Sequence, residues 1–216
     1  MVNRRFLLKI CKFGKFVVIL QPKKNNKPME TKSLRAWIIA MLACLGGYVL
    51  YSGLINWIPN TLFFQYFSIF VYSTVPLCVL MIGLLFTKEG SSQLAKWGGA
   101  LFAIDGAIGL LWQVLLLIGK IQSTTLISTP LLVSHTCLGA LLKSAAFILF
   151  ALYFADKRML GWAIVIAVSE LAFAGTLSAW RMIPDNHILM SLYALFSVIV
   201  LVCEVVFLVK MLKKLK

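Results

Sequence analysis

The chain has 216 residues, 61% of them hydrophobic, and a formal net charge of +14. A soluble domain is about 45–50% apolar, so this composition excludes an ordinary water-soluble core. The basic residues lie at the ends of long apolar runs. Membrane topology therefore explains the positive charge better than binding to nucleic acid does.

Residues 1–33 form a polar and basic segment before the first long apolar run. Its basic and apolar residues fall on separate helical faces, a pattern typical of a helix lying on an anionic membrane surface. An equally weighted alternative is that translation begins at Met29, and that residues 1–28 come from an upstream start. No small-residue cleavage site follows the short apolar stretch, so we expect no cleaved signal peptide.

Six long apolar segments follow in chain order, at approximately 34–54, 61–87, 95–119, 131–154, 159–180 and 188–209. Each has at least the roughly 20 residues that a helix needs to cross a bilayer. A backbone in lipid must satisfy its own hydrogen bonds, so spans of this length are helices. The sequence therefore predicts an all-α integral membrane protein. Residues 34–209 form a bundle of six transmembrane helices, and residues 210–216 are a basic tail.

The distribution of basic residues predicts the orientation of the bundle. If both termini lie on one side, that side carries 18 of the 21 Lys and Arg residues, and the other carries only Lys120 and Arg181. Cytoplasmic loops are enriched in Lys and Arg, so we expect cytoplasmic N and C termini. We place the protein in a bacterial inner membrane, with anionic lipid as a partner at its cytoplasmic face.

Two local patterns in the spans predict packing features. Pro76 interrupts the second span, and we expect a kink whose lost hydrogen bond is compensated by the hydroxyls of Ser73 and Thr74. In the third span, small residues recur at four-residue spacing, which favours close helix packing. These residues are Gly99, Ala103 and Ala107.

Four ionisable residues lie inside the spans: Asp105, Lys143, Glu170 and Glu204. A charge at the bilayer centre costs at least about 2.5–3.5 kcal/mol, so these residues point to chemistry or assembly. The first three fall near the midplane, whereas Glu204 falls about one and a half turns from the inner end of the last span, where it either stays protonated or reaches water. Gln113 shares the helical stripe of Asp105. We expect Lys143 to pair with Asp105 or Glu170, because an unpaired ammonium at that depth is too costly.

This intramembrane polar site supports three hypotheses. The first is a proton-coupled transporter or channel-like protein; the second is a non-catalytic membrane subunit whose buried charges specify homo- or hetero-oligomer assembly. The third is a lipid-modifying enzyme of the membrane. Phosphate-binding loops, zinc-protease motifs and hydrolase nucleophile motifs do not occur in the sequence, so we assign no catalytic residues.

The sequence gives no reason to expect a cofactor or a metal. His135 and His187 lie near the outer ends of their spans, whereas bis-histidine haem sites place two histidines deeper and facing one another. The cysteines lack metal-ligand spacing and are expected to be small buried apolar residues without disulfides. They are Cys11, Cys44, Cys78, Cys137 and Cys203.

Overall fold

The computed structural model describes residues 31–54, 61–122, 128–183 and 185–215. The predicted surface helix of residues 1–33 lies almost entirely outside these ranges. The described residues form six helices: α2 (Thr31–Leu54), α3 (Leu62–Glu89), α4 (Gln93–Ile121), α5 (Thr129–Tyr153), α6 (Lys157–Met182) and α7 (His187–Lys214). All six are long and apolar enough to cross a membrane, as expected of a polytopic membrane protein.

Polar side chains cap the N-termini of three helices, α4, α6 and α7, and explain where these helices begin. The Ser92 hydroxyl accepts a hydrogen bond from the backbone N–H of Ala95 at the start of α4. Asn186 Oδ1 accepts from two backbone N–H groups of the first turn of α7, at 3.0 and 3.1 Å. Such caps satisfy the N–H groups that lack a partner in the first helical turn.

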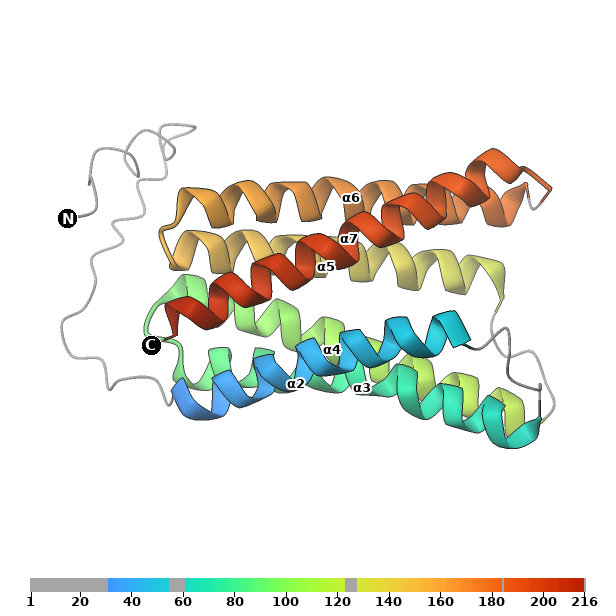
Figure 1. Cartoon of the computed structure of the whole chain (residues 1–216), viewed down its shortest axis with the longest axis horizontal. Coiled ribbons are helices and arrows are strands. Elements are labelled where there is room, and N and C mark those ends of the chain that lie inside the picture. Colours follow the sequence, from blue (N-terminus) through green and yellow to red (C-terminus); the bar gives the residue numbers. More distant parts are fainter. Residues whose placement is uncertain (1–30, 55–60, 123–127, 184, 216) are drawn as a thin grey trace.

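The six helices run lengthwise through the bundle (Figure 1), and their contacts form a ring in which each helix packs against its neighbours in sequence. Among the described residues, α3 and α4 pack most extensively. The ring is closed by α2 and α7, which pack least. The start of α2 and the end of α7 lie at the same end of the bundle (Figure 1). We call the half of the bundle at this end the proximal half, and the opposite half the distal half.

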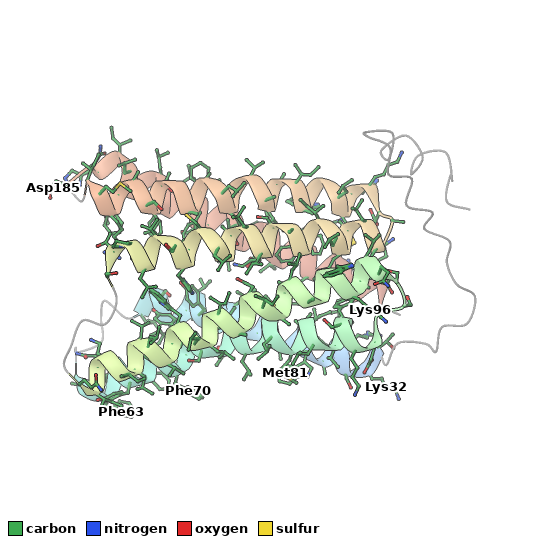
Figure 2. The ribbon with its side chains drawn as sticks, turned by 180° about the vertical axis from the view of Figure 1, so that it is seen from behind. Lys32, Phe63, Phe70, Met81, Lys96 and Asp185 are labelled. Atoms are coloured by element: carbon green, nitrogen blue, oxygen red, sulfur yellow. The ribbon has the colours of Figure 1, made fainter. Side chains whose placement is uncertain are left out.

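Figure 2 places charged and aromatic side chains relative to these ends. Lys32 and Lys96 lie at the proximal end, whereas Asp185 lies at the distal end. Phe63 and Phe70 project from the distal part of α3 and are exposed on the outside of the bundle. Exposed aromatic rings on the outside of an apolar helix suit a lipid environment.

The extensive α3–α4 contact depends on glycine. A Cβ atom on Gly83 would lie 2.3 Å from the Ala103 nitrogen, and one on Gly99 would lie 2.7 Å from the Gly83 oxygen. A Cβ on Gly106 would lie 2.4 Å from a backbone nitrogen of α3. The predicted ridge is therefore correct for Gly99 and Ala103 but wrong for Ala107, which is exposed. Gly106 takes its place, because the buried face of α4 continues at a spacing of three residues.

Pro76 lies inside α3, as predicted, but its expected compensation differs. Ser73 and Thr74 donate to carbonyl oxygens four and three residues before them, each at 2.7 Å. Neither acceptor is the Tyr72 carbonyl, which is the group that Pro76 leaves without an N–H donor. The two hydroxyls therefore satisfy themselves within the helix and do not replace the bond that proline removes.

The proximal half holds most of the buried core. Five phenylalanines from α3, α4, α5 and α7 meet there without solvent exposure: Phe86, Phe102, Phe147, Phe150 and Phe207. Their rings form a continuous chain of contacts, with centroid distances between 4.5 and 5.7 Å. We call this group the aromatic plug. It fills the proximal half of the ring with apolar side chains.

The distal half is more open. Residues 46–50 of α2 are all exposed, although they cover every side of the helix. No other atom lies within 4 Å of where a Cβ would sit on Gly46 or Gly47. In Figure 1, α2 and α7 diverge toward the distal end. The part of α2 beyond the plug therefore packs loosely over residues 46–50, although Tyr51 is buried and its hydroxyl lies 2.6 Å from Oγ of Ser68 on α3.

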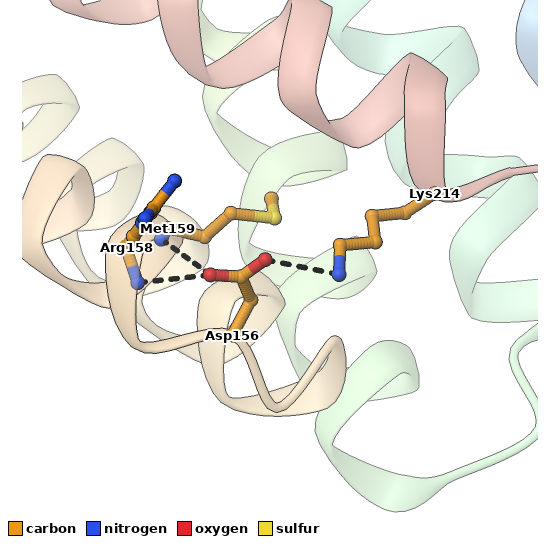
Figure 3. A network of polar contacts seen from close by, with 4 residues as sticks. All are labelled: Asp156, Arg158, Met159 and Lys214. Atoms are coloured by element: carbon orange, nitrogen blue, oxygen red, sulfur yellow. Dashed lines mark hydrogen bonds and ion pairs between the residues drawn. The ribbon is translucent and has the colours of Figure 1, made fainter.

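A polar contact fastens the proximal end of the ring (Figure 3). Asp156 caps α6, because its Oδ1 accepts from the backbone N–H groups of Arg158 and Met159 at 2.8 and 3.2 Å. Its Oδ2 lies 3.0 Å from Nζ of Lys214, at the end of α7. The hydrogen bond from Lys214, assisted by the two backbone donors, lowers the pKa of Asp156. The preceding residue, Ala155, has a φ of 50°, in the left-handed region.

Candidate functional site

Three of the intramembrane ionisable residues come together in the structure. Nζ of Lys143 on α5 lies 2.8 Å from Oε1 of Glu170 on α6 and 3.2 Å from Oε1 of Glu204 on α7. We call these three residues the ion cluster. The predicted pairing of Lys143 with Asp105 or Glu170 is confirmed for Glu170.

Of the two alternatives for Glu204, a carboxyl that stays protonated or one that reaches water, the second is wrong. Glu204 is 5% exposed and belongs to the ion cluster. The reason is that Glu204 lies on the face of α7 that packs inside the bundle, where its carboxylate meets Lys143 of α5. In addition, α7 continues to Lys214, beyond the predicted end at residue 209. Long lysine side chains can extend along apolar surface toward water, so the lysines at the end of α7 do not end the helix. The extra length places Glu204 about 15 Å from the end of α7, at 1.5 Å per residue.

The ion cluster is buried on its acidic side and accessible on its basic side. Glu170 and Glu204 are 4% and 5% exposed, whereas the Lys143 side chain is 26% exposed. Both Oε1 atoms are buried, and each has Nζ of Lys143 as its partner at ion-pair distance. The two carboxylates share one ammonium group, so the cluster carries one unbalanced negative charge when both are ionised.

Asp105 and Gln113 lie apart from the ion cluster. Within the described part of the chain, Asp105 forms no ion pair of 4.0 Å or less, although it lies within electrostatic reach of Lys143 and Glu170. Its Oδ1 lies 3.2 Å from where a Cβ would sit on Gly139, so the glycine lets this carboxyl group approach α5. Oε1 of Gln113 is buried without a hydrogen-bond partner.

The ion cluster lies immediately distal to the aromatic plug. Lys143 precedes Phe147 by four residues on α5, and Glu204 precedes Phe207 by three residues on α7. These spacings correspond to about one helical turn, and both helices run from the distal to the proximal end. The ion cluster therefore sits at the boundary between the closed proximal half and the more open distal half.

Aromatic residues distal to the ion cluster were missed at the level of the sequence. Tyr48 and Tyr72 approach with ring centroids 5.2 Å apart, and Phe173 and Tyr193 stack at 5.1 Å. Tyr48 is also within electrostatic reach of Tyr193 and Lys143. The available signal was that all four lie well inside the spans, away from the interfaces where aromatic residues are usually enriched.

The remaining candidate ligands are dispersed. His135 stacks on Trp112, with ring centroids 4.2 Å apart, while His187 is exposed at the start of α7. The Sγ atoms of Cys44 and Cys78 lie 3.9 Å apart, and both residues are free thiols. In the ranges that the structure describes, no group of three or more His, Cys, Asp or Glu residues could hold a metal ion.

Comparisons with protein-family models, with curated proteins and with solved structures give no match for this chain. The class of protein is therefore defined by the fold alone: an all-helical protein with six helices able to span a membrane.

Proposed function

We propose that this protein is a small proton-coupled transporter or channel-like protein whose polar site is the ion cluster. The observation that carries the proposal is the position of the cluster. Two buried carboxylates share one ammonium group at the boundary between an apolar plug and a more open half. Intramembrane ionisable groups commonly mark proton and substrate pathways.

The charge of the ion cluster supports proton binding. When both carboxylates are ionised, the cluster carries one negative charge that Lys143 does not balance. One proton on either glutamate neutralises the cluster and leaves Lys143 paired with the other. The ion cluster therefore has two neutral protonation states of similar geometry, one with the proton on Glu170 and one with the proton on Glu204. Lys143 is the accessible member, so a proton would enter or leave from its side.

The aromatic plug supports a gated pathway. Fully buried phenylalanines exclude water from the proximal half, so the ion cluster would exchange with the distal side while the plug is closed. Opening toward the proximal side would require these rings to separate. The α2–α7 contact is the weakest in the ring, so we place the movement at this seam.

We further propose that the proximal side faces the cytoplasm of a bacterial cell, with anionic lipid at that face. Lysines and arginines gather at the proximal helix ends, as the positive-inside rule requires. In a cysteine-free background, a single cysteine at Gln122 should react with an impermeant maleimide in intact cells, whereas one at Ser92 should be protected. The opposite pattern would reverse the orientation.

Proton flux into proteoliposomes containing a pH-sensitive dye tests the proposed function. We expect Glu170→Gln and Glu204→Gln to reduce flux to the level of empty liposomes, because each removes a proton-binding group. Lys96→Met is the matched control, since it removes a lysine at the proximal end of α4 that does not touch the cluster. A variant with methionine at Lys143, Glu170 and Glu204 that folds and retains wild-type flux would refute the proposal.

The subunit hypothesis remains the second candidate, because the Lys143 side chain is 26% exposed and a partner helix could cover it. In that case, the variant with methionine at Lys143, Glu170 and Glu204 would lose its oligomeric state, and the wild type itself would show no proton flux. The ion cluster lies about 15–20 Å from the proximal helix ends, at 1.5 Å per residue. It is therefore too deep for the headgroup chemistry expected of a lipid-modifying enzyme.

A further inference from the structure

We infer that Asp105 is an alternative partner of Lys143, and that Lys143 exchanges between the glutamates of the ion cluster and Asp105 when a proton moves between these carboxyl groups. The inference gives Asp105 a proton-binding role in the proposed transporter and rests on that function.

Asp105 lies at the same level of the bundle as the ion cluster. It follows Phe102 of the aromatic plug by three residues on α4, which begins at the proximal end (Figure 2). Phe102 contacts Phe147, the plug residue one turn proximal to Lys143, with ring centroids 5.5 Å apart. Asp105, Lys143 and Glu204 therefore each lie about one helical turn distal to a plug phenylalanine.

The backbone of α5 lets Asp105 approach the turn next to Lys143. Oδ1 of Asp105 lies 3.2 Å from where a Cβ would sit on Gly139, and it is the only atom of another described helix within 4 Å of that position. Gly139 precedes Lys143 by four residues, so both lie on one face of α5, about 6 Å apart along the axis. Cα–Cβ bonds in a helix tilt toward its N-terminus, so the Lys143 ammonium group has the turn at Gly139 within reach.

Electrostatic interactions couple Asp105 to the ion cluster, although no ion pair joins them in this arrangement. Among the described residues, Asp105 forms no ion pair of 4.0 Å or less, but its carboxyl group lies within electrostatic reach of all three members of the cluster. Tyr48 of α2 also lies within electrostatic reach of Lys143. The part of α3 that packs against α4 beside Asp105 is apolar, at Pro76 and Leu80. Lys143 is therefore the cation that Asp105 can recruit.

The exchange conserves protons and charge. When Lys143 pairs with the glutamates, two protons neutralise the four groups, one on a glutamate and one on Asp105. When Lys143 pairs with Asp105, both glutamates carry a proton. Passing from the first arrangement to the second breaks the O–H bond of Asp105 and forms an O–H bond on the ionised glutamate, while Lys143 keeps its three protons. Both arrangements are neutral, so neither leaves a net charge among apolar side chains.

Thermal unfolding of the purified full chain in detergent tests the exchange. The double variant Glu170→Gln, Glu204→Gln mimics protonation of both glutamates, so Lys143 should pair with Asp105. Adding Asp105→Asn to the double variant should then lower the Tm by roughly 6–20 °C, which corresponds to the loss of a buried pair in a chain of this size. In the wild type, Asp105→Asn should lower the Tm by less than about 4 °C, because Asp105 makes no ion pair there. An equally small decrease in both backgrounds would overturn the inference.

Proton flux into proteoliposomes provides a test that does not require the double variant to fold. Asp105→Asn should reduce flux to the level of empty liposomes. Gly139→Ala should also reduce flux, because the added methyl group would push the Asp105 carboxyl group away from α5. Gly175→Ala on α6 is the matched control and should retain wild-type flux, since no atom lies within 4 Å of its added Cβ.

The flux results also separate this inference from the proposed function. If Asp105→Asn retains wild-type flux while Glu204→Gln abolishes it, Asp105 is not a proton site; the inference then fails and the proposed function stands. If the wild type itself shows no flux, the proposed function fails, and the role of Asp105 as a proton site fails with it.

Discussion

Removing the ammonium group from the ion cluster should destabilise the protein strongly. In the Lys143→Met variant, a side chain of similar length keeps the packing of α5 but removes the positive charge. Glu170 and Glu204, which are 4% and 5% exposed, are then left together without a cation. Like charges that share a buried site cannot both ionise cheaply.

The distances set the magnitude of the effect. At 2.8 and 3.2 Å, each Lys–Glu attraction is roughly 5–6 kcal/mol with an effective dielectric constant of about 20. Desolvation offsets much of this gain, so breaking a buried pair by removing one partner costs about 3–5 kcal/mol. For a chain of this size, that cost corresponds to a decrease in Tm of roughly 6–20 °C.

Thermal unfolding of the purified protein in detergent measures this cost. The triple variant with methionine at Lys143, Glu170 and Glu204 should recover most of the lost stability, because a buried ion group replaced as a whole by apolar residues is often tolerated. Asp105→Asn is the control. Among the described residues, Asp105 makes no ion pair, so the change should cost less than about 1 kcal/mol.

Two outcomes would refute this reasoning. If Lys143→Met changes the Tm no more than Asp105→Asn does, the ammonium group does not stabilise the buried carboxylates. If the triple variant is less stable than Lys143→Met, the remaining carboxylates are not the source of the destabilisation.

Further predictions concern packing and the proximal end, each measured by Tm. Gly83→Ala should lower the free energy of unfolding by about 1–3 kcal/mol, because the added Cβ would meet the α4 backbone. Gly47→Ala should stabilise α2 by up to about 1 kcal/mol, because the space around Gly47 is open. Asp156→Ala should cost about 0.5–2 kcal/mol through the lost cap. Because the folded pKa of Asp156 lies below the ordinary value of 3.8, its ionic contribution is present above that pH and is lost as the pH falls below it. Lys214→Met should reduce this dependence and leave the part that comes from the backbone donors of Arg158 and Met159. Ala155→Gly should stabilise the protein by up to about 1 kcal/mol, since glycine adopts the positive φ without strain.

The sequence alone determined the six spans and predicted that Lys143 pairs with Asp105 or Glu170, of which the structure selects Glu170. Length and hydropathy are sufficient for the spans, because a helix that crosses lipid must be long, apolar and internally hydrogen bonded. Helical periodicity then placed Lys143 and Glu170 on small, polar faces at similar depths. The cost of an isolated charge made their pairing the expected result.

Only the tertiary structure decided which other residues belong to the site. Glu204 joins the ion cluster and Asp105 does not, although their sequence patterns suggested the reverse. Periodicity fixes the face of a residue on its own helix, but it does not fix how far neighbouring helices slide or rotate relative to one another. Here those parameters depend on contacts between distant residues, such as the glycine backbone contacts of α3 with α4 and the ring contact of Phe147 with Phe207.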